Sequence, residues 1–265
     1  FILAVRLWQQ SVSVKWGQQV TKMKTLFLAL LFCASNASAF GWARAVRFSG
    51  GAGGVVGCSP ISATCTGSCT SADSGIYKVF TFTSGTSSIT FSCGGSVDRL
   101  VVGGGGSGWE QTDAIGGSGG GAGGVIEQAT IVNSSAYTVI VGSGGANGGG
   151  SGLSWAGVNS SFNSLVAYGG GGGCKTGGTY GSGGGACPTS SPPLAGGVGT
   201  EGQGHSGGQT SYGANYYPGG GGGGCSAAGA DQISGDWGGN GGLGCTSSIT
   251  GTATCYGGGG GGGTY

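Results

Sequence analysis

The ten cysteines are the residues of this sequence with the most distinctive chemistry. Cys33 lies in a segment that reads as a cleaved leader, which leaves nine, an odd number. In an oxidising compartment such cysteines form disulfides, and an odd count leaves at least one thiol free or bonded to another chain. We expect the early cysteines to pair among themselves, Cys174 with Cys187, and Cys225 with Cys245 or Cys255. The full set of candidates is Cys58, Cys65, Cys69, Cys93, Cys174, Cys187, Cys225, Cys245 and Cys255.

A zinc site is the competing interpretation of the cysteines. The sequence has no Cys-x-x-Cys pair, and its one histidine, His205, stands alone in Glu201-Gly-Gln-Gly-His205. Zinc sites in proteins use four closely spaced cysteine and histidine ligands. We therefore expect no metal and no cofactor.

His205 also invites a catalytic interpretation, with Asp231 or Asp236 as its carboxylate partner. A hydrolase of this kind needs a nucleophile beside a histidine that a carboxylate orients on a rigid scaffold. The sequence shows no nucleophile motif, and glycine-rich loops are poor scaffolds. We expect an exposed loop histidine and a protein that is not an enzyme.

The glycines Gly103, Gly105 and Gly108 follow the apolar run Leu100–Val102 in the spacing of a dinucleotide-binding fingerprint. That fingerprint needs a helix directly after its glycines, because the helix N-terminus binds the phosphate. The following residues, 109–115, run back into glycine instead. The match is one that a glycine-rich chain produces by chance.

Asn133 and Asn159 each begin an Asn-Ser-Ser sequence, which is a glycosylation signal in a eukaryotic secreted protein and an ordinary turn sequence in a bacterial one. Both remain candidate glycosylation sites.

The first 39 residues divide in two. Residues 1–22 show no coherent pattern, and we interpret them as non-native upstream translation. From Met23 a basic start, an apolar core at Leu26–Phe32 and the small residues Ala37-Ser38-Ala39 form a signal peptide over 23–39. We expect a secreted, extracellular protein; a bipartite plastid leader, suggested by Phe40 and the arginines that follow it, is the alternative.

The chain after residue 39 has five basic and eight acidic side chains, a formal net charge of −3. No basic patch is present for nucleic acid, and no later apolar stretch is long enough to span a membrane. We expect neither as a partner.

The remaining sequence predicts three parts. Residues 40–75 form a cysteine-containing extension. Residues 76–168 carry short apolar and β-branched runs that predict strands at 77–83, 88–92, 100–102, 125–132, 137–141 and 165–167, the first two as a hairpin around Ser84-Gly85-Thr86. No segment after the leader shows a helical apolar period.

Residues 169–265 are dominated by glycine runs, of which Gly257–Gly263 is the longest. A glycine run alone should stay disordered, but only 6% of residues are charged, which argues against a disordered chain. Glycine can form the extended threefold polyproline II helix, and without Cβ atoms several such helices can pack side by side. We expect a mainly β fold, a short sheet or sandwich packed on a disulfide-stapled bundle of polyglycine II helices, with no substantial α-helix.

Aromatic residues in the bundle must lie on its rim or in its loops, because only outer helices have room for side chains. The loops 109–115, 210–218 and 226–237 collect aromatic and acidic residues. They either bind a partner or cap the ends of the helices. The candidate partner-binding residues are Trp109, Tyr212, Tyr216, Tyr217 and Trp237.

Five motifs between residues 99 and 260 resemble, in order, a glycine-rich domain: Arg99–Gly106, Gly116–Val125, Tyr137–Gly145, Ser161–Gly172 and the closing Gly241–Gly260. This family occurs in phage tail-fibre adhesins and many environmental proteins, with a related module in the anaplastic lymphoma kinase receptor ectodomain. The resemblance covers about residues 76–265. It implies a β-sheet that leads into a polyglycine II bundle whose loops form a binding surface, in proteins that are not enzymes. The signal peptide, Cys245 and Cys255 depart from the phage pattern and suggest a secreted, disulfide-stapled version.

The first functional hypothesis is a secreted structural protein that assembles with itself into an extracellular fibre, coat or matrix. The second is an adhesin that binds a cell-surface ligand through the bundle's loops. Ice binding is a third, weakened because glycine does not occur at every third position as it does in springtail antifreeze proteins.

Overall fold

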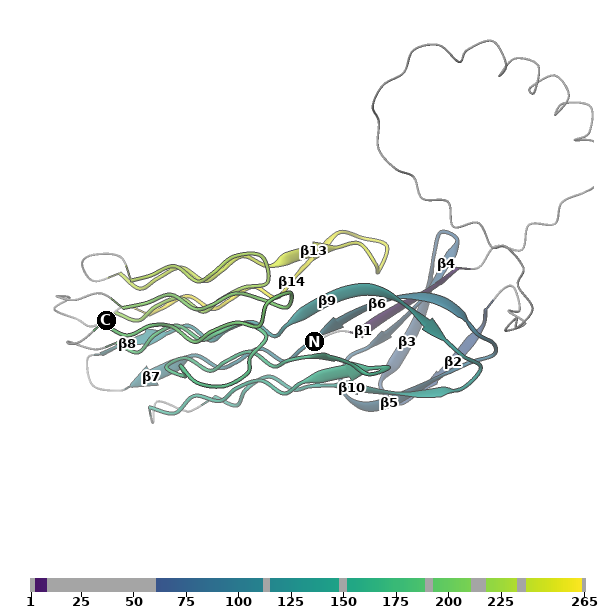
Figure 1. Cartoon of the computed structure of the whole chain (residues 1–265), viewed down its shortest axis with the longest axis horizontal. Helices are drawn as coiled ribbons and strands as arrows, with labels where there is room; N and C mark the ends of the chain where they lie inside the picture. The colour runs from purple at the N-terminus through teal and green to yellow at the C-terminus, as the bar shows by residue number, and fades with distance from the viewer. Residues whose placement is uncertain are drawn as a thin grey trace, which may run out of the picture.

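The computed structural model describes residues 3–8, 61–111, 115–147, 152–188, 193–210, 218–232 and 237–263. These residues contain the strands β1 to β14 and no helix, which confirms the expected mainly β fold. The molecule is elongated, with a β-sandwich at one end and a bundle of wavy extended segments at the other (Figure 1). The expected signal peptide at 23–39, together with residues 9–22 and 40–60, lies outside the described residues.

Two five-stranded sheets form the sandwich. The first has the order β3 (Cys69–Ser74), β4 (Tyr77–Phe82), β1 (Leu3–Trp8), β6 (Gly95–Val102) and β9 (Val125–Val132). The second has the order β12 (Leu165–Ala167), β11 (Ser160–Phe162), β10 (Ala136–Val141), β5 (Gly85–Phe91) and β2 (Ala63–Thr66). Two short hairpins, β7 (Trp109–Gln111) with β8 (Ile115–Ser118) and β13 (Cys245–Ser247) with β14 (Thr254–Tyr256), lie outside it.

The core lies between the two sheets and follows the alternation of the strands. Phe80 and Phe82 of β4 and Ile89 and Phe91 of β5 are buried in one cluster. Alternate side chains of a strand point to opposite faces, so every second apolar residue reaches this cluster. Burial of such large side chains stabilises the sandwich by about 1.5–3 kcal/mol each.

The expected hairpin at 77–92 is wrong, although the structure has strands at both places. β4 pairs with β1 and β3, whereas β5 pairs with β2 and β10 in the other sheet. The short connection, Thr83-Ser84, crosses from one sheet to the other, and Gly85, the first residue of β5, has a φ of 63°. A hairpin turn and a sheet-crossing turn share the same short polar signal, and burial of the aromatic faces decides between them.

Residues 3–8 form strand β1 at the centre of the first sheet, paired antiparallel with both β4 and β6. Leu3, Val5 and Leu7 are fully buried in the core. Residues 1–22 show no coherent pattern in the sequence, so this strand is an unforeseen part of the fold. The interpretation of 1–22 as non-native translation stays a prediction.

The bundle segments are joined by hydrogen bonds that repeat every three residues. Gly104 and Ser107 donate to Val158 and Trp155 of one neighbour, while Gly103 and Gly106 donate to Gly124 and Gly121 of another. This repeat is that of the threefold polyproline II helix, in which residues i and i+3 face the same neighbour.

The run 219–224 shows why glycine is required. Its amides and carbonyls bond to six neighbouring segments, at 118–124, 181–186, 205–209, 227–230, 239–242 and 257–263. A Cβ atom on Gly222 would overlap the carbonyl oxygen of Gly120. With neighbours on every side, a fully enclosed segment tolerates no side chain.

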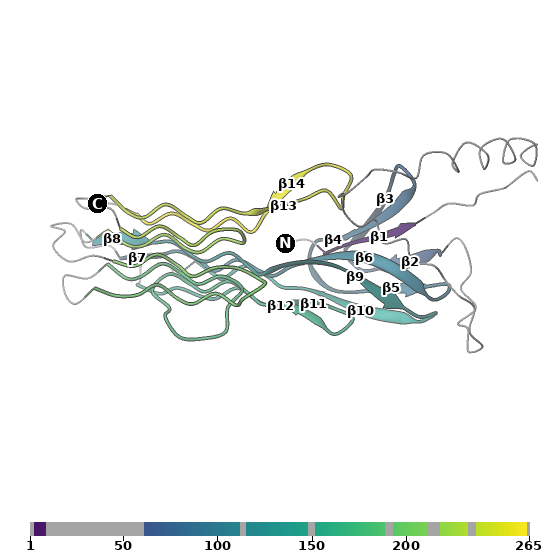
Figure 2. The ribbon, with the colours of Figure 1, turned by 45° about the horizontal axis from the view of Figure 1, so that its top comes forward.

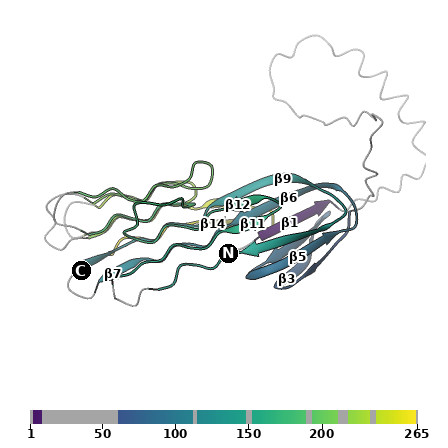
Figure 3. The same ribbon diagram turned by 60° about the horizontal axis from the view of Figure 1, so that its bottom comes forward.

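The bundle continues the sandwich end to end rather than lying against one of its faces (Figure 2). β6 and β10 run on directly into bundle segments, and the glycines before β9 return from the bundle to the sheet. The same continuity is visible from a steeper tilt (Figure 3). The register of the sandwich therefore positions the bundle segments beside one another.

Candidate association surfaces

The C-terminal run Gly257–Gly263 lies at the surface of the bundle. Gly259 and Gly262 donate to the segment at 239–242, and Gly260 and Gly263 donate to Gly120 and Gly117. Gly258 and Gly261, the third row of this threefold helix, donate to no other described backbone group and are exposed. We call this row the glycine face.

The glycine face has room for side chains that the sequence does not supply. A Cβ on Gly258 would meet nothing within 4 Å, and one on Gly261 would approach only a carbonyl oxygen at 3.9 Å. Neither residue has a positive φ. Glycine at these two positions is therefore not required by the fold of the single chain.

The adjoining segment at 237–244 presents its own open row. Trp237, Asn240 and Leu243 repeat every three residues and are exposed, with Trp237 at 69% and Leu243 at 71%. Because Gly259 bonds to Gly242 in an antiparallel pair of segments, Leu243 lies level with Gly258. The segment that pairs with the glycine run therefore carries exposed apolar side chains.

A second apolar surface lies on the segment at 152–158. Leu153, Trp155 and Val158 are 54%, 54% and 51% exposed, while Ser154 between them is buried. We call these three residues the apolar ridge. Trp155 and Val158 share one row of the threefold helix, and their carbonyls bond inward to Ser107 and Gly104.

The two surfaces lie on segments that share no backbone hydrogen bond with each other. Two segments separate them: 103–108 bonds to the ridge segment, and 118–124 bonds to both 103–108 and the glycine run. Neither surface was expected from the sequence. The available signal was the threefold spacing of Trp155 with Val158 and of Trp237 with Leu243.

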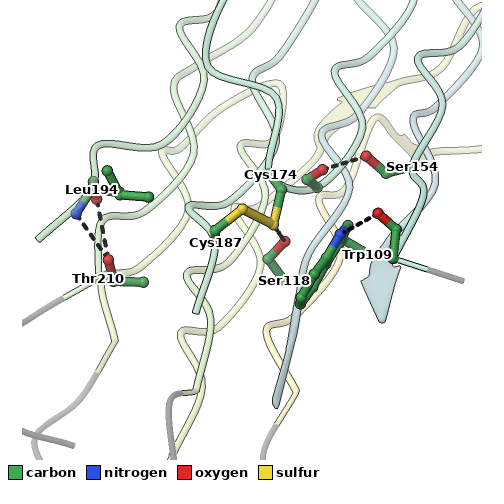
Figure 4. The surroundings of a disulfide bond; sticks show 9 residues. Trp109, Ser118, Ser154, Cys174, Cys187, Leu194 and Thr210 are labelled. Carbon is green, nitrogen blue, oxygen red and sulfur yellow. Dashed lines mark hydrogen bonds between the residues drawn. A yellow bond between two sulfur atoms is a disulfide. The ribbon is translucent and has the colours of Figure 1, made fainter. Parts of the chain in front are cut away.

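At the end of the bundle far from the sandwich, side-chain hydrogen bonds and a disulfide hold neighbouring segments together (Figure 4). The indole of Trp109 donates to the carbonyl of Gly152 at 2.7 Å, and Ser154 donates to that of Gly173. The Cys174–Cys187 disulfide lies beside Ser118, whose Oγ is 3.4 Å from the sulfur of Cys174. The amide of Leu194 donates to Thr210 Oγ1 at 3.0 Å.

The candidate partner-binding residues fall into different environments. Trp109 is half-buried with its N–H bonded, which is the environment of a residue that fastens the segment ends, whereas Trp237 is open to solvent. Tyr212, Tyr216 and Tyr217 lie outside the described residues. A binding role stays a prediction for all five.

Between described residues, three cysteine pairs are disulfide-bonded: Cys65–Cys69, Cys174–Cys187 and Cys225–Cys245. Of the two partners considered for Cys225, the structure therefore selects Cys245. Cys93 is disulfide-bonded as well, and Cys58 lies outside the described residues. Cys255 of β14 is a free, exposed thiol.

The groups considered for catalysis are not brought together. The side chain of His205 is exposed, and Glu201 and His205 line a hollow of about 450 Å³ beside the Cys225–Cys245 disulfide. The carboxylate of Asp231 accepts a hydrogen bond from the backbone amide of Gln209 at 2.7 Å. Asp236 lies outside the described residues. Within the described part of the chain, no group of three or more potential ligands could hold a metal ion.

The fingerprint glycines belong to the bundle. Gly103 donates a backbone hydrogen bond to Gly124, Gly105 accepts one from Gly145, and no helix follows them among the described residues. The described residues also include no helix of the length and hydrophobicity that a membrane span needs.

Both glycosylation candidates are exposed. Asn133 lies in the turn between β9 and β10, where its backbone amide donates a hydrogen bond to the hydroxyl of Tyr137 at 2.8 Å. The Oδ1 of Asn159 accepts the amide of Gly169 at 2.9 Å, which holds a bundle segment next to β11. Glycosylation at either residue stays a prediction.

Arg99 is a buried cation in the sandwich, 6% exposed. Its Nη1 donates to the carbonyls of Phe162 at 2.9 Å and Asn163 at 3.1 Å, which ties β6 to the second sheet. Burial lowers the pKa of Arg99, because desolvation disfavours the charged form.

Comparison with known proteins identifies the family of the chain. A search of curated proteins and a search of solved structures each found no match. A family model described as "Glycine-rich domain" matches residues 81–265, from the end of β4 through the whole bundle. The family suspected from the five motifs is therefore confirmed, and the chain belongs to the glycine-rich domain family.

Proposed function

We propose that this is a secreted structural protein whose bundles associate side by side into an extracellular filament. The observation that carries the proposal is the glycine face. Gly258 and Gly261 form a row of backbone without side chains, and their amides donate hydrogen bonds to no described backbone group. An open row of this kind resembles the edge of a β-sheet, which pairs readily with another chain.

The apolar ridge is a suitable partner for this face. Residues three apart on a polyproline II helix are about 9 Å apart along the axis, so Trp155 and Val158 share the axial spacing of Gly258 and Gly261. The ridge of one copy can fill the space that the glycines of the next copy leave open. Leu243 and Trp237 would bury apolar surface at the border of this contact.

Contact between these two different surfaces, which lie on separate segments of the bundle, would produce a filament. Contact between different surfaces of identical subunits is heterologous, and such contacts form open chains where the rotation does not close a ring. Each added copy then presents a fresh glycine face. A contact between two identical faces would instead stop at a dimer.

Electron microscopy and sedimentation of the secreted protein test the proposal. We expect filaments from the wild-type chain, and their loss in the double variant Gly258→Glu with Gly261→Glu, because two carboxylates would occupy the face. Trp155→Ser should weaken assembly from the other side. Gly177→Glu is the matched control, because Gly177 is also an exposed glycine, and a Cβ added to it would meet nothing within 4 Å.

Filaments that persist in the double variant with unchanged length would contradict the glycine face as the contact. Small discrete particles from the wild-type protein at all concentrations would contradict assembly itself.

A second candidate function, an adhesin, rests on the fastened far end of the bundle. Trp109, the Cys174–Cys187 disulfide and the Leu194–Thr210 bond hold several segment ends in one place. A rigid base of this kind suits loops that bind a ligand. Binding of the discrete wild-type particle to cell surfaces, lost in Trp237→Ser but retained in Gly258→Glu, would favour this function over filament formation.

A further inference from the structure

The central strand of the first sheet comes from the part of the chain that precedes the leader. β1 pairs with β4 from Leu3–Phe82 to Trp8–Tyr77 and with β6 from Leu3–Val101 to Arg6–Asp98. Because β4 and β6 do not pair with each other, β1 alone joins the two halves of this sheet. We call the space between β4 and β6 the strand slot.

Cleavage of the leader after Ala39 would remove β1. The slot would then expose the unpaired backbone groups of β4 and β6 and uncover core residues such as Phe80 and Val101. Unpaired buried backbone groups and exposed apolar surface both cost free energy. The secreted protein therefore needs another strand in this place.

A segment just after the expected cleavage site repeats three consecutive residues of β1. Ala45-Val46-Arg47 reproduces Ala4-Val5-Arg6, and Phe48 takes the position of Leu7. The alternation matches as well: positions equivalent to Val5 and Leu7, which are fully buried, hold Val46 and Phe48.

The repeated arginine has a defined function in β1. Arg6 donates to the carboxylate of Asp98 at 3.0 Å, and its guanidinium lies 4.3 Å from the centre of the Tyr77 ring. Arg47 in the same register would meet the same carboxylate and ring. Arg44 falls at the position of Leu3, so the matching strand begins one residue later, at Ala45.

The chain between the repeat and β2 is long enough. Residues 50–62 can span up to about 40 Å when extended. The last residues of β1 and the start of β2 lie at one end of the sandwich. Arg6 of β1 pairs with Asp98, three residues after the start of β6 at Gly95, so the end of β1 lies near Gly95. The side chain of Ile61, just before β2, also lies against Gly95.

We propose that residues 45–49 of the same chain fill the strand slot of the secreted protein in place of β1. The slot is thus a strand-binding site, and cleavage of the leader exchanges one occupant for another. This inference rests on the proposed secretion, but not on filament formation.

Hydrogen exchange of the protein secreted from the full chain tests the proposal. N-terminal sequencing should show that the product begins at Phe40. The amides of residues 45–49 should then exchange at least about tenfold more slowly than in the full chain refolded without cleavage, in which β1 occupies the slot.

Substitutions provide a second test. Val46→Asp would place a carboxylate in the core and should abolish secretion of folded protein, whereas Ala43→Asp, just outside the repeat, should not. An added peptide with the sequence of residues 3–8 should restore folding of the Val46→Asp chain.

Three results would overturn the proposal: a secreted product that retains residues 3–8, rapid exchange at 45–49 in the cleaved protein, or normal secretion of Val46→Asp. Residues 45–49 could also exchange slowly only when the protein is multimeric, with Val46→Asp dispersing the multimers. That result would place residues 45–49 of a second copy in the slot instead. Slow exchange at residues 45–49 in a protein that forms no filaments would support the proposal about the slot and contradict only the proposed function.

Discussion

The amide of Gly222 donates to the carbonyl of Gly260 at 2.8 Å, so an enclosed glycine run and an exposed one lie side by side. The two runs have the same composition but different surroundings. Around the first, other backbones occupy every direction in which a side chain could point. Along the second, one row of three is open.

This difference predicts opposite effects of the same substitution. Gly222→Ala should lower stability by at least about 1–3 kcal/mol, because the new methyl group overlaps the Gly120 carbonyl. Gly261→Ala should be neutral or stabilise by up to about 1 kcal/mol, since it only restricts the unfolded chain. Thermal unfolding of the two dispersed variants measures both effects, and equal melting temperatures would contradict the bundle packing.

The cysteines should separate into structural and free ones. Cys187→Ser opens a disulfide with a sequence separation of 13 and should cost about 2–4 kcal/mol in unfolding free energy. Cys255→Ser should leave stability unchanged and remove any disulfide-linked multimers from a non-reducing gel. Multimers that survive Cys255→Ser would assign the intermolecular link to a different cysteine.

Arg99 should matter far more than an exposed cation. Arg99→Ala leaves the buried carbonyl of Phe162 and the part-buried carbonyl of Asn163 without the guanidinium donor and should destabilise by about 2–4 kcal/mol. Lys78→Ala is the control, because Lys78 pairs with Asp73 at the surface at 3.4 Å and should cost less than about 1 kcal/mol. Denaturant unfolding compares the two, and similar midpoints would show that Arg99 does not tie the sheets together.

Glycosylation can be tested on protein secreted by a eukaryotic host. Endoglycosidase should shift the mobility of the wild-type chain, and Asn133→Gln and Asn159→Gln should each remove part of that shift. Asn159→Gln should also lower the melting temperature, because Asn159 accepts the amide of Gly169. No shift in the wild-type chain would remove both sites.

The sequence by itself determined the local structure and the family. The strand predicted at 125–132 is β9, and that at 137–141 lies within β10, because both runs are rich in β-branched residues, which favour strands. The glycine runs, the Cys174–Cys187 pair and the five ordered motifs likewise predicted a disulfide-stapled bundle of the glycine-rich domain family. These features depend on neighbours in the sequence, which a single chain reveals.

Only the tertiary structure decided which segments meet. It separated β4 from β5 into two sheets, inserted Leu3–Trp8 between β4 and β6, and left Gly258 and Gly261 open while enclosing Gly222. Each outcome depends on burial against residues far away in the chain, and such contacts leave no local pattern. A glycine at the centre of the bundle and a glycine on its surface are identical in the sequence. Only the number of backbone segments packed around each one distinguishes them.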